Sequence, residues 1–324
     1  MRFVVVGAGA IGGLVGGRLA QHGHDVVLVA RGAHGAAIAA DGLLIRSPEG
    51  DDRVQVPVVG HAGALDLGPD DVVLLAVKGQ DTAAALDTLA DGPPDLAIAC
   101  LQNGVENERQ ALRRSSRVYP VPVMCPATHL VPGVVEVWSA PVNGILDVGR
   151  YPAGVDETAV AISAALASSG FSSEPNPAVM RFKWSKLLMN LANALEAAVG
   201  SVRDAMDLYL AARAEGREVL DAAGIDVATD EEEAARRGDL VSMRPINGEK
   251  RGGGSSWQSL ARGSGTIEAD TLNGEIVLLG RLHGVPTPVN ELLQRTAHHL
   301  ARSGAAPGSM TAEELAAQLP SGTL

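Results

Sequence analysis

A glycine-rich turn near the start of the chain constrains the fold more than any other feature. The turn Gly7-Ala8-Gly9-Ala10-Ile11-Gly12 follows an apolar run at residues 3–6 and precedes a helical pattern that ends near Gly23. A second apolar run at residues 26–29 completes a strand–helix–strand unit of the length typical of dinucleotide-binding proteins. In such a unit the first glycine permits a tight turn, the second admits a pyrophosphate, and the third lets the helix pack on the strand. The helix N-terminus then directs free N–H groups at the phosphates.

The end of the second strand indicates which dinucleotide binds. A site for NAD places Asp or Glu here to accept hydrogen bonds from the ribose 2′-hydroxyl group. This chain has Ala30-Arg31-Gly32 instead. A guanidinium group cannot accept hydrogen bonds, but its planar fork can pair with a 2′-phosphate. The sequence therefore favours NADPH over NADH, with a solvated loop arginine as the alternative.

Two further apolar runs, at residues 71–77 and 96–101, are typical of parallel strands covered on both faces. Lys78 follows the first run and Asn103 follows the second. Because ligands of open parallel sheets bind at the carboxyl ends of the strands, we expect both side chains near the cofactor. Residues 128–149 alternate apolar and polar side chains, which predicts antiparallel strands that close this first domain.

The second half of the chain is predicted to be helical, and one of its segments carries an unusual polar stripe. Asn190 and Asn193 each fall within about 40° of Lys186 on a helix that is otherwise apolar. A lysine and two carboxamides among apolar residues favour a face turned to a polar ligand, although a solvated face remains the alternative.

Glu268 is predicted to begin another helix, whose apolar face continues through Leu272, Ile276 and Leu279. A carboxylate on an apolar face needs a partner or a raised pKa, and a lysine would supply that partner. The loop that precedes this region contains Gly252-Gly253-Gly254-Ser255-Ser256, which is typical of a mobile lid or of a flexible connection.

Length, charge and cysteine content limit the class of protein. A chain of 324 residues is expected to form two domains, and a net charge of −12 leaves no basic excess for a nucleic acid or an anionic membrane. Cys100 and Cys125 are expected to be small core residues rather than metal ligands, so no metal site is predicted. No leader or membrane-spanning run is apparent, which favours the cytoplasm. The sequence leaves the oligomeric state open, a homodimer included.

Taken in order along the whole chain, these residues resemble the ketopantoate reductase (2-dehydropantoate 2-reductase) family. The resemblance also covers Ser255-Ser256 and Asn273-Gly274. It implies an α/β protein with a Rossmann-type NADP-binding domain over residues 1–175. An all-helical substrate and catalytic domain, like the C-terminal domain of 6-phosphogluconate dehydrogenase, is implied over residues 176–324. The implied activity is reduction of a small 2-oxo acid, ketopantoate, in pantothenate biosynthesis.

The resemblance also implies a role for each site residue. Lys186 would be the general acid that protonates the alkoxide formed by hydride transfer, and Glu268 would orient this lysine and contact the substrate. The substrate would be bound by Asn103, Asn190, Asn193 and Ser256. The cofactor would be bound by Gly7, Ala8, Gly9, Ala10, Ile11, Gly12, Arg31 and Lys78, together with Asn103 and Glu268. A positioned ammonium group fits this chemistry, because it stabilises charge that appears only in the transition state.

The chain departs from the family pattern at positions that surround the implied substrate. Ala194 stands where the family has a second asparagine, and Gly253 stands where many members have another. Trp257 and Ser259 replace the Met and Asp often found after the serine pair. These departures keep a second reading open, a reductase of the same family that acts on a different 2-oxo acid or ketone. A third reading is a non-enzymatic NADPH-binding sensor, for which the polar stripe would have no use.

Overall fold

The computed structural model describes all residues from Met1 to Leu324 and divides them into two compact units. The first unit contains Met1–Lys183 and Asp230–Arg251, and the second contains Trp184–Thr229 and Gly252–Leu324. The single boundary predicted between residues 175 and 176 differs from this division in two places. The chain leaves the first unit eight residues later than predicted, after Lys183, and it returns to the first unit for residues 230–251.

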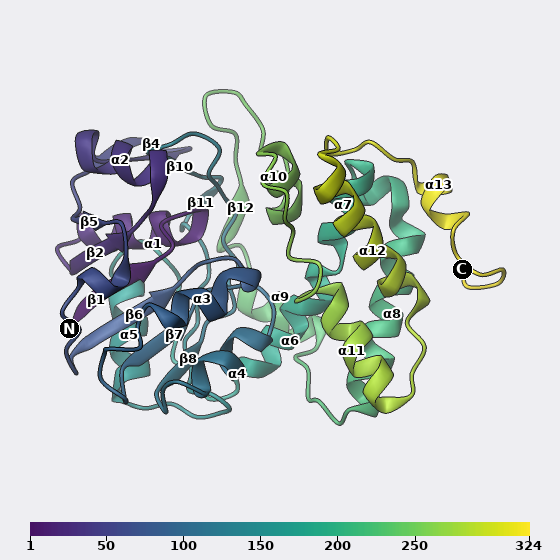
Figure 1. Cartoon of the computed structure of the whole chain (residues 1–324), viewed down its shortest axis with the longest axis horizontal. Helices are drawn as coiled ribbons and strands as arrows, with labels where there is room; N and C mark the ends of the chain where they lie inside the picture. The colour runs from purple at the N-terminus through teal and green to yellow at the C-terminus, as the bar shows by residue number, and fades with distance from the viewer. The chain divides into compact units, whose positions relative to one another are not determined.

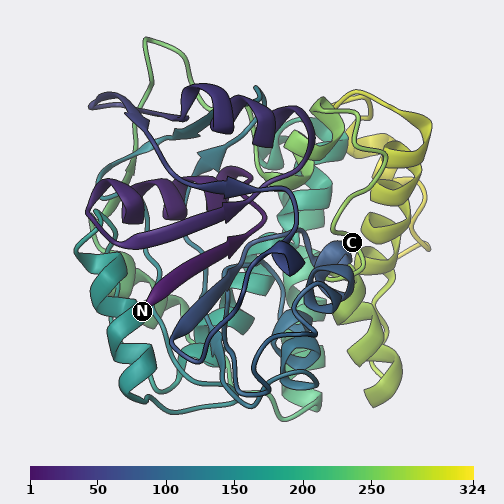
Figure 2. The ribbon, with the colours of Figure 1, turned by 60° about the vertical axis from the view of Figure 1, so that its left-hand side comes forward.

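A parallel sheet of six strands forms the centre of the first unit (Figure 1). Its strands are β1 (Arg2–Val6), β2 (Asp25–Val29), β5 (Val58–Val59), β6 (Asp71–Leu75), β7 (Ala97–Cys100) and β8 (Val118–Pro120). Their order is β5-β2-β1-β6-β7-β8, and every neighbouring pair is parallel. Strands β1 and β2 lie side by side at the purple end of the colour scale (Figure 2). The predicted strands at residues 3–6, 26–29, 71–77 and 96–101 are thus confirmed, with ends that differ by one or two residues.

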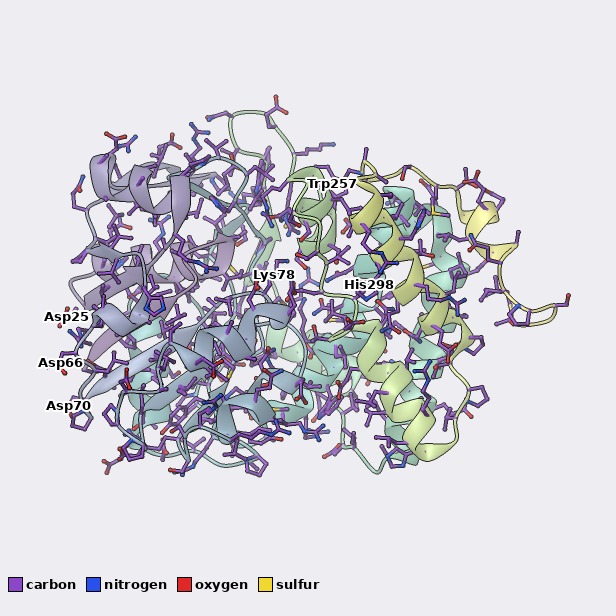
Figure 3. All side chains as sticks on the ribbon, viewed as in Figure 1. Asp25, Asp66, Asp70, Lys78, Trp257 and His298 are labelled. Atoms are coloured by element: carbon purple, nitrogen blue, oxygen red, sulfur yellow. The ribbon has the colours of Figure 1, made fainter.

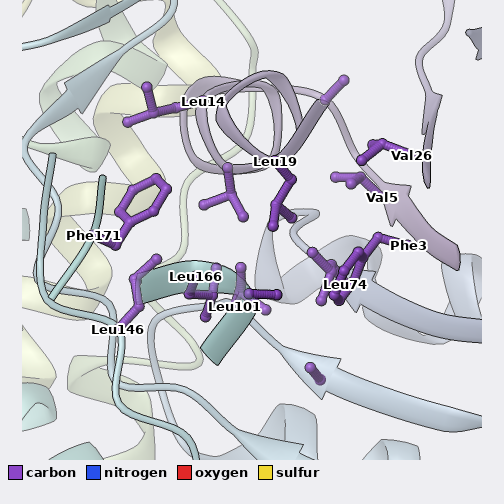
Figure 4. Packing of buried hydrophobic residues seen from close by; sticks show 14 of the residues in the cluster. Phe3, Val5, Leu14, Leu19, Val26, Leu74, Leu101, Leu146, Leu166 and Phe171 are labelled. Atoms are coloured by element: carbon purple, nitrogen blue, oxygen red, sulfur yellow. The ribbon is translucent and has the colours of Figure 1, made fainter. Parts of the chain in front are cut away.

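Apolar side chains of this sheet alternate between two cores, as the period of a strand requires. Phe3, Val5 and Leu74 join the core that packs against helix α1 (Ala10–Gln21), which contributes Leu14 and Leu19 (Figure 4). The residues between them, such as Val4 and Val73, belong to the core on the other face. The sheet is therefore covered on both sides, which explains its nearly continuous apolar runs.

The remaining helices of the sheet region are short. They are α2 (Gly32–Asp41), η1 (Ala62–Ala64), η2 (Gly79–Asp81), α3 (Thr82–Asp87), α4 (Glu106–Leu112) and α5 (Glu157–Ala167). Helix α5 has an ordinary N-cap, because the Asp156 carboxylate accepts a hydrogen bond from the Ala159 N–H.

Two smaller sheets complete the first unit, and the sequence predicted them only in part. The four-stranded sheet has the order β4-β3-β10-β9 and contains β3 (Leu43–Ser47), β4 (Gly50–Val54), β9 (Ala127–Thr128) and β10 (Val134–Val137). Within the predicted antiparallel stretch, β10 pairs antiparallel with β9, but it also pairs parallel with β3. Strand β11 (Ser139–Pro141) pairs with β12 (Val241–Met243), which lies in the half of the chain predicted to be entirely helical.

Ion pairs hold the returning segment to the first unit. Arg236 of helix α9 (Asp230–Arg237) donates two hydrogen bonds to the Asp147 carboxylate, at 2.7 and 2.6 Å. Glu232 of the same helix accepts two from Arg181, at 2.7 and 2.9 Å. The hydrogen bonds from Arg236 to Asp147 raise the pKa of the guanidinium group. Paired charges with this bidentate geometry fix the orientation of α9.

The second unit is helical, as predicted. Helix α6 (Val179–Asn190) enters it from the first unit, and α7 (Ala192–Val199), η3 (Val202–Ala205), α8 (Met206–Ala222), α10 (Ser255–Ala261), α11 (Asn273–His283), α12 (Pro288–Ser303) and α13 (Ala312–Ala316) follow. Helix α13 begins with a capping box between Thr311 and Glu314. None of the helices combines the length and the apolar character that crossing a bilayer requires.

Candidate active-site residues

The glycines of the turn between β1 and α1 occupy three different environments. Gly7 has φ +98°, and a side chain there would come within 2.9 Å of the Val77 nitrogen. A side chain at Gly12 would overlap the Gly7 carbonyl oxygen. At Gly9, in contrast, a Cβ atom would meet nothing within 4 Å. The first and third glycines thus serve the turn and the packing of α1, while the second borders the open space that a pyrophosphate would need.

Three other predicted cofactor residues lie at the same edge of the parallel sheet as this turn. Arg31 follows β2, Lys78 follows β6, and Asn103 follows β7. Since these strands neighbour one another or β1 in a parallel sheet, their carboxyl ends share one edge. Figure 3 shows Lys78 far from Asp25, Asp66 and Asp70, which lie near the amino ends of the strands. Arg31 is exposed and precedes the first residue of α2.

A buried hydrogen-bond network connects the loops that carry Lys78 and Asn103. The Gln102 side-chain amide donates to the Val77 carbonyl at 2.9 Å and to the Thr82 hydroxyl at 2.8 Å. Thr82 in turn donates to Asn107 at 2.8 Å, and Asn107 donates to the Asn103 carbonyl at 2.9 Å. Sequence reasoning missed Gln102, although it directly precedes Asn103. The network fixes the backbone on both sides of the two predicted ligands.

A buried ion pair lies beside this network. The Lys183 ammonium group of α6 is 2.9 Å from Glu108 Oε1 of α4, with the two side chains 2% and 0% exposed. Lys183 also donates to the Gln102 carbonyl at 2.7 Å. Burial raises the pKa of the neighbouring Cys100 thiol, and the Glu108 carboxylate raises it further. Sequence reasoning missed this pair because Lys183 and Glu108 lie on different helices, 75 residues apart along the chain.

In the second unit, the polar stripe is divided between two helices. Lys186 and Asn190 are one turn apart near the end of α6, and Asn190 is only 5% exposed. Leu191 interrupts the helix, so that Asn193 belongs to α7. The Asn193 amide is 3.4 Å from the Ser255 hydroxyl, to which it donates. The predicted side chains are thus confirmed as helical, but not as one continuous helix.

The interruption at Leu191 coincides with a buried hydrogen-bond chain. Asn273 donates to the Leu191 carbonyl at 3.3 Å and to Asn290 at 3.0 Å. Asn290 donates to Glu215, whose carboxylate also accepts the Val289 N–H at the start of α12. Burial raises the pKa of Glu215. These contacts fix the backbone between Asn190 and Asn193 and therefore the spacing of the two amides.

The glycine-rich loop leads into helix α10, and Glu268 lies outside any helix. The Gly254 N–H donates to the Glu196 carboxylate at 2.9 Å, and Ser256 is 2% exposed on α10. Glu268 does not begin a helix; it lies in a turn, five residues before the first residue of α11. Glu268 is 5% exposed, and the pKa of Arg262 is lowered by burial and raised in part by the Glu268 charge. Leu272, with φ −116° and ψ −94°, separates the turn from the helix.

Comparison with known proteins assigns the chain to a family. The sequence-family model described as "Ketopantoate reductase PanE/ApbA" matches residues 3–152, and the family model of its C-terminal domain matches residues 178–301. The chain belongs to the ketopantoate reductase family. It is accordingly an oxidoreductase, and the family and the α/β-plus-helical fold predicted from the sequence are both confirmed.

Individual relatives match over nearly their full length. A 2-dehydropantoate 2-reductase of Pyrococcus horikoshii is 29% identical over 303 residues, which cover 90% of this chain and 95% of the relative. One from Halobacterium salinarum is 29% identical over 300 residues, 89% of this chain and 95% of its own.

Solved structures of the ketopantoate reductase fold agree with this assignment. The crystal structure of a ketopantoate reductase from Ralstonia eutropha superposes with a TM-score of 0.78 at 28% identity, covering 94% of this chain and 99% of its own. A D-mandelate dehydrogenase solved with NADH and anilino(oxo)acetate has a TM-score of 0.79 at 21% identity, covering 94% and 99%, and therefore shows the shared fold alone.

Proposed function

We propose that this protein uses NADPH to reduce ketopantoate to pantoate, in the cytoplasm and as a step of pantothenate synthesis. The observation that carries the proposal is the pair Lys186 and Asn190, one turn apart on a helix whose flanking residues Leu187, Leu188 and Leu191 are buried. An ammonium group and a carboxamide on one helix turn provide a proton donor and a hydrogen-bonding group for the carbonyl of a substrate.

The dinucleotide would bind along the carboxyl edge of the parallel sheet. The open space at Gly9 fits a pyrophosphate, because a Cβ atom there would meet nothing within 4 Å. The exposed Arg31 would pair with the 2′-phosphate of NADPH, and no carboxylate follows β2 at Ala30 or Gly32 to accept from a free ribose hydroxyl. The fold alone does not select the phosphate, since the D-mandelate dehydrogenase of the same fold was solved with NADH.

When bound, the reduced nicotinamide supplies the hydride. The residues of this chain would bind and polarise the substrate and move one proton. Lys186 Nζ would stabilise the negative charge that develops on the carbonyl oxygen and then donate its proton to that oxygen. The buried Glu268 would orient this lysine and hydrogen-bond the substrate. Asn103, Asn190, Asn193 and Ser256 would orient the substrate by hydrogen bonds.

The first test is oxidation of NADPH with ketopantoate, measured beside NADH and a panel of other 2-oxo acids. We expect kcat/KM for ketopantoate of about 10⁴ M⁻¹s⁻¹ or more, an ordinary value for an enzyme. Lys186→Ala is expected to lower kcat about 10²-fold or more while NADPH still binds. Arg31→Ala is expected to weaken binding of NADPH far more than binding of NADH. Equal losses for the two cofactors would contradict the phosphate assignment.

One observation favours a different substrate within the same chemistry. Ala194 is 3% exposed and stands where the family has an asparagine, so that a carboxamide is replaced by a methyl group. A pocket that lacks this hydrogen-bonding group would distinguish ketopantoate less strongly from 2-oxo acids without its hydroxyl group. Turnover of another 2-oxo acid in preference to ketopantoate would support this second candidate. Tight NADPH binding without turnover of any carbonyl compound would support a sensor instead.

A further inference from the structure

His34 makes one hydrogen bond to the glycine-rich turn and a second to the turn at Gly133. His34 lies in the first turn of α2, three residues after Arg31. Its Nε2 atom is 2.7 Å from the Ala8 carbonyl oxygen. Its Nδ1 atom is 2.8 Å from the Gly133 nitrogen, in the turn before β10. One imidazole ring thus connects α2, the glycine-rich turn and the smaller sheet.

The two bonds fix both the charge and the tautomer of the ring. The Gly133 N–H can only donate, so Nδ1 must accept and must carry no proton. The Ala8 carbonyl can only accept, so Nε2 must carry the proton. Burial lowers the pKa of His34, while the bond to Ala8 raises it in part. The neutral Nε2–H form is therefore the form that satisfies every partner.

The bond to Ala8 determines where the next N–H group points. The Ala8–Gly9 peptide bond is trans, since the cis bonds of the chain are Ala140–Pro141 and Tyr151–Pro152. In a trans peptide the carbonyl and the following N–H point in opposite directions. With the Ala8 carbonyl held by His34, the Gly9 N–H points away from the ring. The Ala8 N–H is also fixed, because it donates to the Val29 carbonyl at 3.3 Å.

We propose that His34 is a positioning residue for the cofactor, which holds the Ala8–Gly9 peptide so that the Gly9 N–H faces the pyrophosphate. This proposal rests on the proposed dinucleotide site. Among the three glycines of the turn, Gly9 is the one with open space beside it, and it is the N-cap of α1, where N–H groups lack partners within the helix. His34 itself contacts no phosphate and acts through the peptide that it holds.

The titratable group that faces His34 is His129, whose ring centroid is 4.0 Å away and whose Nδ1 atom is 2.9 Å from the Val134 carbonyl. The glycine-rich turn and the turn at Gly133 carry no ionisable side chain. Arg31 is the charged residue nearest along α2, and no charged group contributes to the lowered pKa of His34. Protonation of His34 would place a second proton on Nδ1, opposite the Gly133 N–H. The bridge would then lose one of its two bonds.

The test replaces His34 in two ways and measures the dissociation constant of NADPH for each variant between about pH 5 and pH 8. Glutamine offers one acceptor and one donor and does not titrate, so His34→Gln can keep both bonds. Leucine keeps the bulk of the ring and offers neither. We expect His34→Leu to weaken NADPH binding about tenfold, the scale of one or two hydrogen bonds, and His34→Gln to stay within about threefold of the parent at pH 8.

The pH profile separates positioning from a merely structural role. In the parent protein, affinity for NADPH is expected to fall as the pH drops below the ordinary pKa of histidine, about 6.5. The NADPH phosphate itself titrates near pH 6, but it does so in every variant, so the difference between the parent and His34→Gln isolates the ring. His129→Phe, which keeps a ring beside His34, is the control for the second imidazole. In His129→Phe, the affinity for NADPH is expected to fall at low pH as it does in the parent.

Each outcome has one meaning. Equal NADPH affinity of folded His34→Leu and parent at pH 8 would overturn the proposal, as would identical pH profiles of parent and His34→Gln. A parent protein that binds neither NADPH nor NADH would overturn the proposed function instead. Thermal unfolding of each variant, measured without cofactor, identifies any that fail to fold. His34→Gln then carries the test, because its pH profile does not depend on the fate of His34→Leu.

Discussion

Removing one partner of the Lys183–Glu108 pair is expected to destabilise the first unit more than removing both. The charged atoms are 2.9 Å apart, and the side chains are 2% and 0% exposed. In Lys183→Met the Glu108 carboxylate would stay buried without a cation, and neither of its oxygens accepts a hydrogen bond of ordinary geometry. Breaking one half of a buried pair costs about 3–5 kcal/mol. The double variant Lys183→Met/Glu108→Leu removes both charges and is expected to recover most of that loss.

Alkylation of Cys100 localises the effect, because two units need not unfold together. Cys100 is fully buried, and both charges act on its thiol. All variants carry Cys125→Ser, so that Cys100 is the cysteine that is alkylated. We expect Cys100 to be alkylated much faster in Lys183→Met than in the parent, and nearly as slowly in the double variant as in the parent. Urea unfolding gives the free energies. A loss below about 1 kcal/mol in Lys183→Met, the scale of an exposed pair, would refute the reasoning. A double variant with the summed loss of both single variants would refute it equally.

Three further predictions concern the backbone near the site. Gly9→Ala is expected to unfold within about 1 kcal/mol of the parent, because its φ of −68° suits alanine and nothing lies within 4 Å, yet to bind NADPH at least about tenfold more weakly. Gly12→Ala is expected to lower the free energy of unfolding by at least about 2 kcal/mol, because its methyl group would collide with the Gly7 carbonyl oxygen. Unchanged NADPH affinity in Gly9→Ala, or an unchanged melting temperature in Gly12→Ala, would contradict these assignments. Asn273→Leu is expected to cost about 2 kcal/mol or more in denaturant unfolding, since it leaves the Leu191 carbonyl without its donor, and a cost below about 0.5 kcal/mol would mean that water replaces the amide.

Local patterns sufficed to predict β1, β2, β6 and β7 of the parallel sheet, but not the short strands β5 and β8 at its two edges. The apolar runs of β1, β2, β6 and β7 are buried on both faces, so their composition reports their position directly. Arg31, Lys78 and Asn103 follow β2, β6 and β7, and a parallel sheet collects the carboxyl ends of its strands at one edge. These predictions depended on short-range sequence alone.

Features created by distant pairing could not be predicted in this way. Strand β12 has only three residues, too few to show an alternating pattern of apolar and polar side chains. It forms because it pairs with β11, about 100 residues earlier. A lysine at position 183 reads as a solvated helix residue until the fold places Glu108 2.9 Å away. The start of the helix near Glu268 was wrong because no Gly or Pro marks Leu272, whose backbone angles end the preceding turn.

The return of residues 230–251 to the first unit has a consequence for synthesis on the ribosome. The first unit lacks β12 and the Arg236 partner of Asp147 until residue 251 has emerged, although its other residues are complete at Lys183. At roughly 5–20 residues per second, the intervening stretch of about 70 residues takes on the order of 3–14 s to translate. During that interval β11 is an unpaired edge, and the Asp147 carboxylate has the Glu174 N–H but not yet the Arg236 guanidinium group. The nascent chain must therefore tolerate an unfinished sheet while the first helices of its second unit are already being made.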